Sequence, residues 1–394
     1  MLRKILIYRQ TIVVEAQNKG VEFMFKAGNE DKVYSGCAIS AVLDKGRNCF
    51  AGDEIVSSIS SMQERSNGLG GGFAAYGIYP EQQDEFAFHV FFTDDQARQE
   101  CSRYLAEHFV ISREEQIPTR QQQVRLNNPP LIWRYFLKPY PEKLNLSGYT
   151  EKEFVAQQTV KINKELQGTY IVSCGQNMGV FKGLGYPAEI AEFYQLENYQ
   201  GYLWTAHGRF PTNTSGWWAG AHPFALLNWS VVHNGEISSF GANKRYIEMF
   251  GYECTMKTDT EVITYLIDLL VRRHGLSLST AARALAAPFW QEIGHLPPGK
   301  QKLLKNIRII YGNALLNGPF SIIMAHKEGL FILNDRIKLR PIVVAESGSK
   351  MYAASEESAI RAICPEPQHI ATPRGGEPVL GLVEGRDIPC KMAQ

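Results

Sequence analysis

The sequence predicts an α+β fold in which stacked sheets are covered by helices on the outside, a layered αββα class. Many short apolar runs edged by turn residues read as strands, and helical patterns are interposed without a strict βαβα alternation. Of the 394 residues, 44% are hydrophobic and 21% are charged, which is ordinary for a globular protein with a sizeable core.

The first hundred residues contain two strand–helix alternations. Residues 37–43, rich in small and β-branched side chains, predict a buried strand, and the helix that follows begins at Asp53 and ends at Asn67 and Gly68. Residues 73–79 and 86–92 alternate like two strands that pair across a loop. A helical pattern then covers residues 93–109.

Composition changes after Ile111. From there to about residue 149 the chain carries five prolines and the polar run TRQQQ, which indicates an irregular excursion outside the core sheet. We expect an insertion at about 110–200 that forms an accessory subdomain beside the active-site cleft or a partner interface. Inside it, a capping box from Thr150 to Glu153 starts a helix, and residues 169–174 return to strand.

The second half is denser in strand signals. A second capping box, from Thr258 to Glu261, opens a helix that ends at Gly275. Seven short strands edged by turn residues surround this helix in the sequence, at 202–210, 229–237, 320–326, 329–333, 341–346, 351–355 and 379–384.

Charge and cysteine usage exclude several classes of function. The net charge of +1 gives no footprint for nucleic acid or an anionic membrane, and the apolar runs are too short for a membrane span, so we expect a cytoplasmic protein. The seven cysteines lack iron–sulfur and zinc spacings, so no metal is expected, and each should be a reduced thiol. The glycines at 68–72 do not match a phosphate-binding pattern and predict a tight turn with close backbone approach.

Three polar motifs stand at intervals of 25 residues. Arg209, Asn234 and Asp259 each lie at the end of a strand or the start of a helix, where side chains face a cleft. Taken singly, they fit a surface ion pair, a turn and a helix cap. Taken together, they offer a guanidinium for a carboxylate, an amide for an oxyanion and a carboxylate for an ammonium. This set suits an α-amino acid whose side-chain carbonyl is attacked.

Cys37 is the candidate nucleophile. It follows Gly36 at the start of a buried strand, and no histidine near it in sequence could act as its base. Cleavage of the Gly36–Cys37 bond would place a new α-amino group, with its low pKa, beside the thiol. Glycine before the cysteine imposes the least bulk at such a bond.

The order of these motifs carries a resemblance. Cys37, RFPTNTS from Arg209, HNGEI around Asn234 and TDTEVI around Asp259 resemble the class II glutamine amidotransferases, which are N-terminal-nucleophile hydrolases. With DRIKLRP (335–341) and AASEESAI (353–360), the chain is most similar to the amidotransferase part of glutamate synthase. The resemblance covers roughly 37–80 and 200–385.

The resemblance implies a role for each of these positions. Cys37 is the nucleophile, Arg209 binds the glutamine α-carboxylate and Asp259 binds its α-amino group. Asn234 and Gly235 form the implied oxyanion hole. The implied glutamine pocket is lined by Thr212, Asn213 and His222. His222 fits a structural histidine equally well. Arg65 stands where the family often has an arginine–glycine turn, but ERSNGLGGG departs from that pattern.

The implied protein is a leader, residues 1–36, followed by a four-layer αββα amidotransferase domain, residues 37–394. Either the leader is removed, or translation starts at Met24 and a shorter leader is removed, or the chain is a non-catalytic regulatory homologue. We expect it to hydrolyse glutamine to glutamate and to pass ammonia to a separate glutamate synthase-like subunit, which would carry FMN and an iron–sulfur cluster; no cofactor is expected in this chain. The alternative acceptors are N-methylglutamate, purine and amino-sugar systems.

Overall fold

The chain divides into two compact units, Met1–Ser35 and Gly36–Gln394. The computed structural model describes residues 6–8, 11–14, 23–26, 36–210, 216–384 and 391–392. In the first unit, β1 (Leu6–Tyr8), β2 (Thr11–Val14) and β3 (Phe23–Lys26) form an antiparallel sheet. The division falls beside the expected end of the leader, and removal of the leader stays a prediction.

A seven-stranded antiparallel sheet carries the candidate nucleophile at the start of one of its inner strands, β4. Ala38 of β4 pairs with Gly208 of β13, and Ala354 of β19 pairs with Ser40 on the other side. The strands in order are β11 (Met178–Gly183), β6 (Gly71–Tyr76), β13 (Leu203–Gly208), β4 (Ala38–Asp44), β19 (Lys350–Ala354), β18 (Val343–Ser347) and β20 (His369–Ala371).

A five-stranded antiparallel sheet carries the second half of the site. Its strands in order are β14 (Phe224–Leu226), β15 (Trp229–Gly235), β16 (Phe320–His326), β17 (Gly329–Asn334) and β21 (Val379–Leu382). Asn234 on β15 lies opposite Ser321 on β16, and Trp229 at the other end of β15 lies opposite His326.

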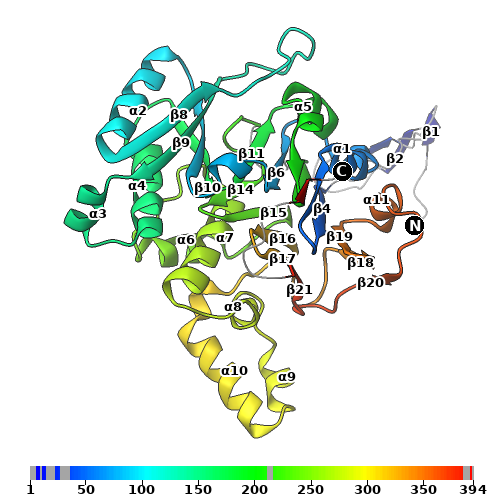
Figure 1. Cartoon of the computed structure of the whole chain (residues 1–394). Coiled ribbons are helices and arrows are strands. Elements are labelled where there is room, and N and C mark those ends of the chain that lie inside the picture. Colours follow the sequence, from blue (N-terminus) through cyan, green and yellow to red (C-terminus); the bar gives the residue numbers. More distant parts are fainter. Residues whose placement is uncertain are drawn as a thin grey trace. The chain divides into compact units, whose positions relative to one another are not determined.

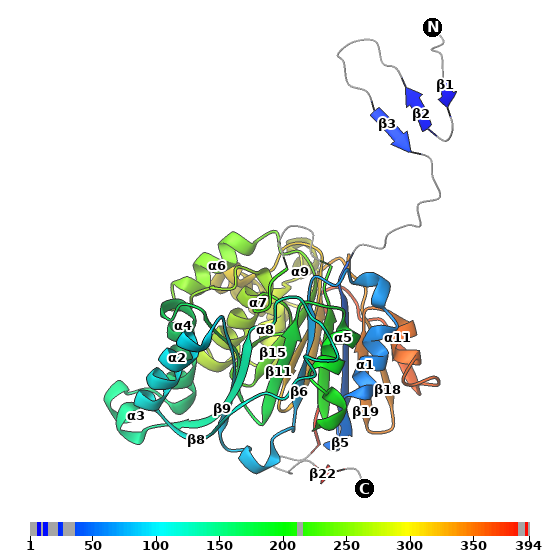
Figure 2. The same cartoon turned by 90° about the horizontal axis from the view of Figure 1, so that it is seen from above.

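The two sheets pack face to face, and helices cover their outer faces (Figures 1 and 2). Branched side chains such as Ile39 of β4, Val232 of β15 and Ile323 of β16 fill the space between the sheets and are fully buried. The helices α1 (Asp53–Ser60), α5 (Pro187–Phe193) and α11 (Glu357–Arg361) cover the larger sheet, and α6 (Phe240–Glu248) and α7 (Asp259–Ile267) cover the smaller one. The predicted αββα class is confirmed.

A separate four-stranded sheet corrects the expected irregular excursion after Ile111. Its order is β10 (Thr169–Gln176), β7 (Phe86–Phe92), β9 (Leu131–Pro139) and β8 (Phe109–Gln116), with α2 (Asp95–His108), α3 (Pro141–Ser147) and α4 (Glu151–Glu165) alongside. The prolines lie mostly in the loop between β8 and β9 and at the strand ends, so they do not interrupt the pairing. Residues 110–200 are therefore divided between this sheet and the seven-stranded sheet, which takes β11.

The expected pairing of residues 73–79 with 86–92 is also wrong. β6 lies in the seven-stranded sheet between β11 and β13, whereas β7 lies in the four-stranded sheet. Gly77, with φ of 91°, ends β6, and a 3-10 turn, η2 (Pro80–Gln82), redirects the chain. The alternation of apolar residues shows that two strands are buried, but it carries no information on which strand each one pairs with.

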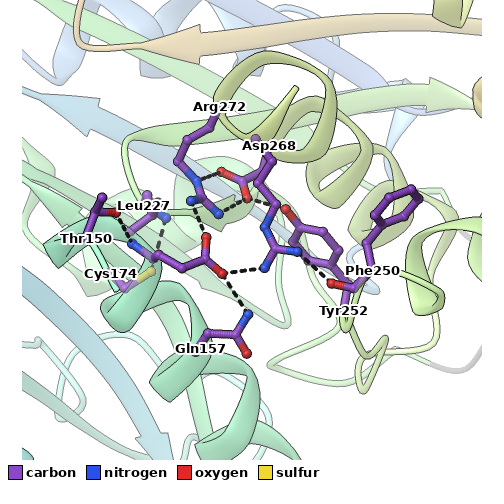
Figure 3. A network of polar contacts seen from close by, with 10 residues as sticks. Thr150, Gln157, Cys174, Leu227, Phe250, Tyr252, Asp268 and Arg272 are labelled. Atoms are coloured by element: carbon purple, nitrogen blue, oxygen red, sulfur yellow. Dashed lines mark hydrogen bonds and ion pairs between the residues drawn. The ribbon is translucent and has the colours of Figure 1, made fainter. Parts of the chain in front are cut away.

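Both threonine caps are confirmed, but neither glutamate completes its capping box. The Thr150 and Thr258 hydroxyls accept hydrogen bonds from the Glu153 and Glu261 amides at 3.2 and 3.1 Å. The Glu153 carboxylate instead binds Arg272 and Arg273, at 2.5 and 2.6 Å (Figure 3). The helix that follows Thr258 also changes form: α7 continues into a π-helical segment, η4 (Asp268–Arg273).

The remaining elements lie outside the three main sheets. They are β5 (Asn48–Ala51), β12 (Gln200–Gly201), β22 (Lys391–Met392), α8 (Leu278–Leu285), α9 (Trp290–Gly294), α10 (Pro298–Ile310), η1 (Gln63–Arg65), η3 (Leu196–Asn198) and η5 (Gly312–Ala314). Cys49 on β5 is disulfide-bonded, so the expectation that every cysteine is a reduced thiol is wrong for this residue. β22 pairs alongside it in parallel, a contact between distant segments that spacing could not predict. Among the described residues, no helix combines the length and apolar character that a bilayer crossing requires.

Candidate active site

Cys37 lies directly before β4, beside the chain that leaves β13. The pairing of Ala38 with Gly208 brings Phe210 alongside, and its amide donates a hydrogen bond to the Cys37 Sγ at 3.4 Å. Burial raises the pKa of the Cys37 thiol, although the Phe210 amide and the positive charge of Arg209 act in the opposite direction. The thiol therefore needs a base to become a nucleophile at neutral pH.

Two guanidinium groups lie close to Gly36. Gly36 has φ of 147°, and a Cβ on it would lie 3.0 Å from Arg340 Nη1 and 3.5 Å from Arg65 Nη2. Arg65 is held there by two contacts: its Nε donates to the Cys37 carbonyl at 3.3 Å, and its Nη1 pairs with Glu356 at 2.7 Å. The positive φ favours glycine at this position, because other residues rarely adopt it.

Asn234 and Gly235 end β15; Asn234 is fully buried and Gly235 is half-buried. The Asn234 Nδ2 donates to the Ser355 hydroxyl at 3.4 Å, and its Oδ1 has no partner among the described residues. Ser355 also accepts from the Ile39 amide at 3.1 Å, which ties the end of β15 to β4. A Cβ on Gly235 would come 2.0 Å from the Pro319 carbonyl oxygen, so no side chain fits there.

Asp259 is the first residue of α7, and its carboxylate is held in the ionised form. One oxygen accepts from the Ile237 amide at 3.1 Å, and the other lies 3.6 Å from Nδ1 of His233. Burial acts to raise the pKa of Asp259, but His233 and the backbone amides outweigh it, so the pKa falls below its ordinary value. An ionised carboxylate at this point can receive an ammonium group.

Arg209 leaves β13 with only 6% of its surface exposed. Its backbone is fixed on the glycine cluster at 68–72, because its amide donates to the Gly70 carbonyl at 2.9 Å. A Cβ on Gly70 would lie 3.3 Å from Arg209 Cδ, which confirms the predicted close backbone approach. Burial lowers the pKa of Arg209, while Cys37 and Asp259 oppose this, so the three groups act on one another electrostatically.

His222 belongs to a buried cluster of three histidines. Its Nε2 lies 2.6 Å from the Thr260 hydroxyl, and its ring stacks on His207 with centroids 4.1 Å apart. His233 reaches the same hydroxyl through Nδ1 at 3.2 Å. Burial lowers the pKa of His207 to about 3 and that of His222 well below its ordinary value, so both rings are neutral. These are the contacts of a structural histidine, with α7 as their anchor.

Thr212 and Asn213, the other expected pocket residues, fall in 211–215 and lie outside the described residues. The structure brings Cys37, Arg209 and Asp259 into electrostatic range of one another. Through Ser355, it links the end of β15 to the strand that begins at Cys37.

Sequence reasoning missed Arg340 and Ser355. Both belong to motifs that carry the resemblance, DRIKLRP and AASEESAI, but their positions in the structure depend on contacts between segments that are distant in sequence. The buried Asp335 carboxylate accepts from the amides of Phe320, Leu339 and Arg340, which bends this loop toward Gly36. No spacing rule predicts that a loop some 300 residues away reaches the nucleophile.

Among the described residues, no group of three His, Cys, Asp or Glu side chains is arranged to hold a metal ion. This region contains the Cys37 thiol, the three guanidinium groups of Arg65, Arg209 and Arg340, the Asp259 carboxylate and the Asn234 amide. Such a set can bind a zwitterionic amino acid and stabilise a negative charge that develops on a carbonyl oxygen.

Comparisons with known proteins agree with this chemistry. The family model "Glutamine amidotransferases class-II" matches residues 90–370, which include Arg209, Asn234 and Asp259 but not Cys37. An uncharacterised protein of Archaeoglobus fulgidus is 46% identical over 360 residues, covering 91% of this chain and 95% of that protein. The amidophosphoribosyltransferase of Methanocaldococcus jannaschii is 26% identical over 192 residues, 48% of this chain and 35% of that enzyme.

A solved structure of the glutamine phosphoribosylpyrophosphate amidotransferase from B. subtilis aligns with a TM-score of 0.45 at 16% identity, covering 91% of this chain and 50% of that one. The family model spans well over half of the chain, including the region at 110–200 that the sequence motifs left unmatched. The chain belongs to the class II glutamine amidotransferases.

Proposed function

We propose that this chain hydrolyses glutamine with Cys37 as the nucleophile and passes the ammonia to a separate, glutamate synthase-like subunit. The observation that carries the proposal is the position of the half-buried Cys37 thiol directly before β4, within electrostatic range of Arg209 and Asp259. A guanidinium and an ionised carboxylate on one side of a thiol match the two charges of a free amino acid.

In the proposed reaction, Arg209 binds the α-carboxylate of glutamine and Asp259 binds its α-ammonium. The Cys37 sulfur attacks the γ-carbonyl carbon, and the negative charge that develops on oxygen is stabilised by the Asn234 side-chain amide and the Gly235 backbone N–H. The tetrahedral species expels ammonia as the carbon–nitrogen bond breaks and leaves a γ-glutamyl thioester. Water then attacks the thioester, which releases glutamate and restores the thiol.

The base in this mechanism is the α-amino group that cleavage of the Gly36–Cys37 bond would create. In the described part of the chain, the Sγ of Cys37 has hydrogen-bond contacts with Phe210 alone, so no histidine is placed to remove its proton. A free α-amine beside the sulfur would take the thiol proton and deliver it to the leaving nitrogen. The proposal therefore requires loss of residues 1–36.

The proposed acceptor of the ammonia is supported by the resemblance of the sequence motifs to glutamate synthase. A partner subunit of that type would carry FMN and an iron–sulfur cluster, and it would aminate and reduce 2-oxoglutarate. A second candidate, the same glutaminase chemistry with another acceptor, is favoured by the similarity to an amidophosphoribosyltransferase, whose name gives a phosphoribosyl acceptor.

The test has two arms. Chain that begins at Cys37 should convert glutamine to equal amounts of glutamate and ammonia, and its Cys37→Ala variant should not. Adding a flavin and iron–sulfur synthase subunit with 2-oxoglutarate should then give a second glutamate that requires a reductant. Failure of the first arm contradicts the glutaminase proposal; success of the first with failure of the second supports another acceptor.

A further inference from the structure

A cavity of about 240 Å³ lies at the opposite end of β15 from the candidate active site. Trp229 lines it, whereas Asn234 lies five positions along the same strand, which at the rise of a β-strand is roughly 17 Å away. None of the residues that line this cavity belongs to the site around Cys37. It is therefore a separate feature of the molecule.

The cavity is mainly apolar and has the size of a small molecule. Its walls include Leu227, Trp229, Leu330 and Phe331, all buried. An apolar cavity of roughly 150 Å³ is enough for benzene, and drug-sized ligands use about 300–1,000 Å³. The volume here suits a ring or branched chain with a few additional atoms.

Two opposite charges stand at the edge of this cavity. Lys152, at the start of α4, and Glu328, in the turn between β16 and β17, both line it. Neither forms an ion pair within the described part of the chain. His326 also lines the cavity, and it is neutral because burial lowers its pKa to about 3. The centroid of its ring lies 4.5 Å from that of Trp229, and its Nδ1 accepts a hydrogen bond from the Glu328 amide at 3.3 Å.

The wall beneath the charges is a rigid, unusual piece of helix. Val271 and Arg272 line the cavity from η4, the π-helical segment, and π-helical turns occur frequently at functional sites. Arg272 is not available to a ligand, because its guanidinium binds both the fully buried Asp268 and Glu153 of α4 (Figure 3). The network instead fixes α4, and with it Lys152, against η4.

We propose that this cavity binds a free amino acid with an apolar side chain. The side chain occupies the space beside Trp229 and Phe331, the α-carboxylate pairs with Lys152, and the α-ammonium pairs with Glu328. A ligand with both charges can pair with both of these exposed groups, whereas a ligand with one charge forms only one of the two ion pairs. The proposal is independent of the glutaminase reaction.

The direct test is calorimetric titration of the purified protein with L-phenylalanine and with L-leucine. We expect saturable binding of at least one of them, with one site per chain. 3-Phenylpropanoate, which is phenylalanine without the ammonium, and phenethylamine, which lacks the carboxylate, should each bind at least about tenfold more weakly. Absence of saturation with both amino acids, or equal affinity for 3-phenylpropanoate, would overturn the proposal.

Variants locate the binding. Lys152→Glu should weaken L-phenylalanine binding at least about tenfold, whereas Lys305→Glu, the same charge change on the exposed face of α10, should leave it unchanged. Val271→Phe should fill the cavity and abolish binding, with circular dichroism to check the fold. Equal binding by the Lys152 variant and the Lys305 control would contradict the assignment.

A last control tests whether L-phenylalanine binds at the candidate active site instead of the cavity. Cys37→Ala should bind L-phenylalanine as the parent does, and saturating glutamine should not displace it. Displacement by glutamine would show that the amino acid occupies the glutamine site and would overturn the separate cavity. Because every readout is binding, the result stands apart from whether the protein hydrolyses glutamine.

Discussion

Arg209 is almost completely buried, although a guanidinium normally remains in water. The opposite charge of Asp259 opposes the effect of this burial only in part, because the pKa of Arg209 is still lowered. A buried guanidinium of this kind can grip a carboxylate with two parallel hydrogen bonds, a geometry that a lysine ammonium cannot reproduce.

Arg209→Lys should therefore lose substrate binding while keeping the charge. We expect kcat/KM for glutamine to fall by roughly 30- to 1,000-fold, equivalent to about 2–4 kcal/mol. The measurement is the initial rate at sub-saturating glutamine, with processing at Cys37 checked by mass. A variant as fast as the parent would remove Arg209 from carboxylate recognition.

In the proposed mechanism, Asn234 is a donor whose effect is greatest when charge develops on the substrate oxygen. Asn234→Ala should lower kcat by about 10²–10³ and leave the far-ultraviolet circular dichroism unchanged. Asn234→Asp should be at least as damaging, because a carboxylate repels the oxyanion. An unchanged kcat in the alanine variant would exclude Asn234 from the oxyanion hole.

At the scale of elements, α4 is fastened to η4 by the ion network around Glu153. This carboxylate receives Arg272 and Arg273, and Arg272 also pairs with the fully buried Asp268 at 2.6 Å. Glu153→Gln should lower the free energy of unfolding by about 2 kcal/mol, because it leaves the half-buried Arg273 without a carboxylate partner and Arg272 with Asp268 alone.

The same helix offers a matched control for this change. Glu165 lies at the exposed end of α4, 4.0 Å from Lys161. Glu165→Gln should change the unfolding free energy by no more than about 0.5 kcal/mol in the same denaturant titration. Equal effects of the two substitutions would mean that the network does not stabilise the junction.

Helix α7 contains a carboxyl group whose burial makes stability depend on pH. Burial raises the pKa of Glu261 from 4.5 to about 7, although its oxygens accept from the Thr255 and Met256 amides. The folded chain then holds this proton to a higher pH than the unfolded chain, so stability is lost as pH rises from about 4.5 to about 7.

Glu261→Gln should remove that pH dependence. The glutamine variant will be less stable overall, since it pairs with one amide fewer, but its loss of stability between pH 5 and pH 8 should be smaller than the parent's by about 3 kcal/mol. Denaturant titrations at the two pH values measure this. An equal loss in both proteins would show that Glu261 ionises normally in the folded chain.

The elements themselves were largely predictable from local pattern. Strands with small and branched buried residues, such as β4, and the threonine caps of α4 and α7 depend on neighbours in sequence. The partners of β6 and β7 and the strands after Ile111 were not predictable, because pairing depends on contacts between distant segments. The partners of the Glu153 and Glu261 carboxylates were not predictable for the same reason: they lie outside the first turn of each helix.

At the scale of the whole molecule, two sheets from distant parts of the sequence meet to form one site. Arg209, Asn234 and Asp259 could be proposed from sequence because each follows a strand or opens a helix. Arg340 reaches Gly36 through the Asp335 turn, and Ser355 joins Asn234 to β4. These long-range contacts hold Arg340 close to Gly36 and join the end of β15 to β4, and the site cannot act as proposed while the Gly36–Cys37 bond is intact.

N-terminal sequencing of the active protein, with its intact mass, tests this central claim most directly. Protein that hydrolyses glutamine should begin Cys-Ala-Ile-Ser and lack every residue before Cys37. A glutamine-like electrophile should then label Cys37 before any other free cysteine. Active protein that still carries Gly36 joined to Cys37 would contradict the account, because its thiol would have no α-amine to serve as base.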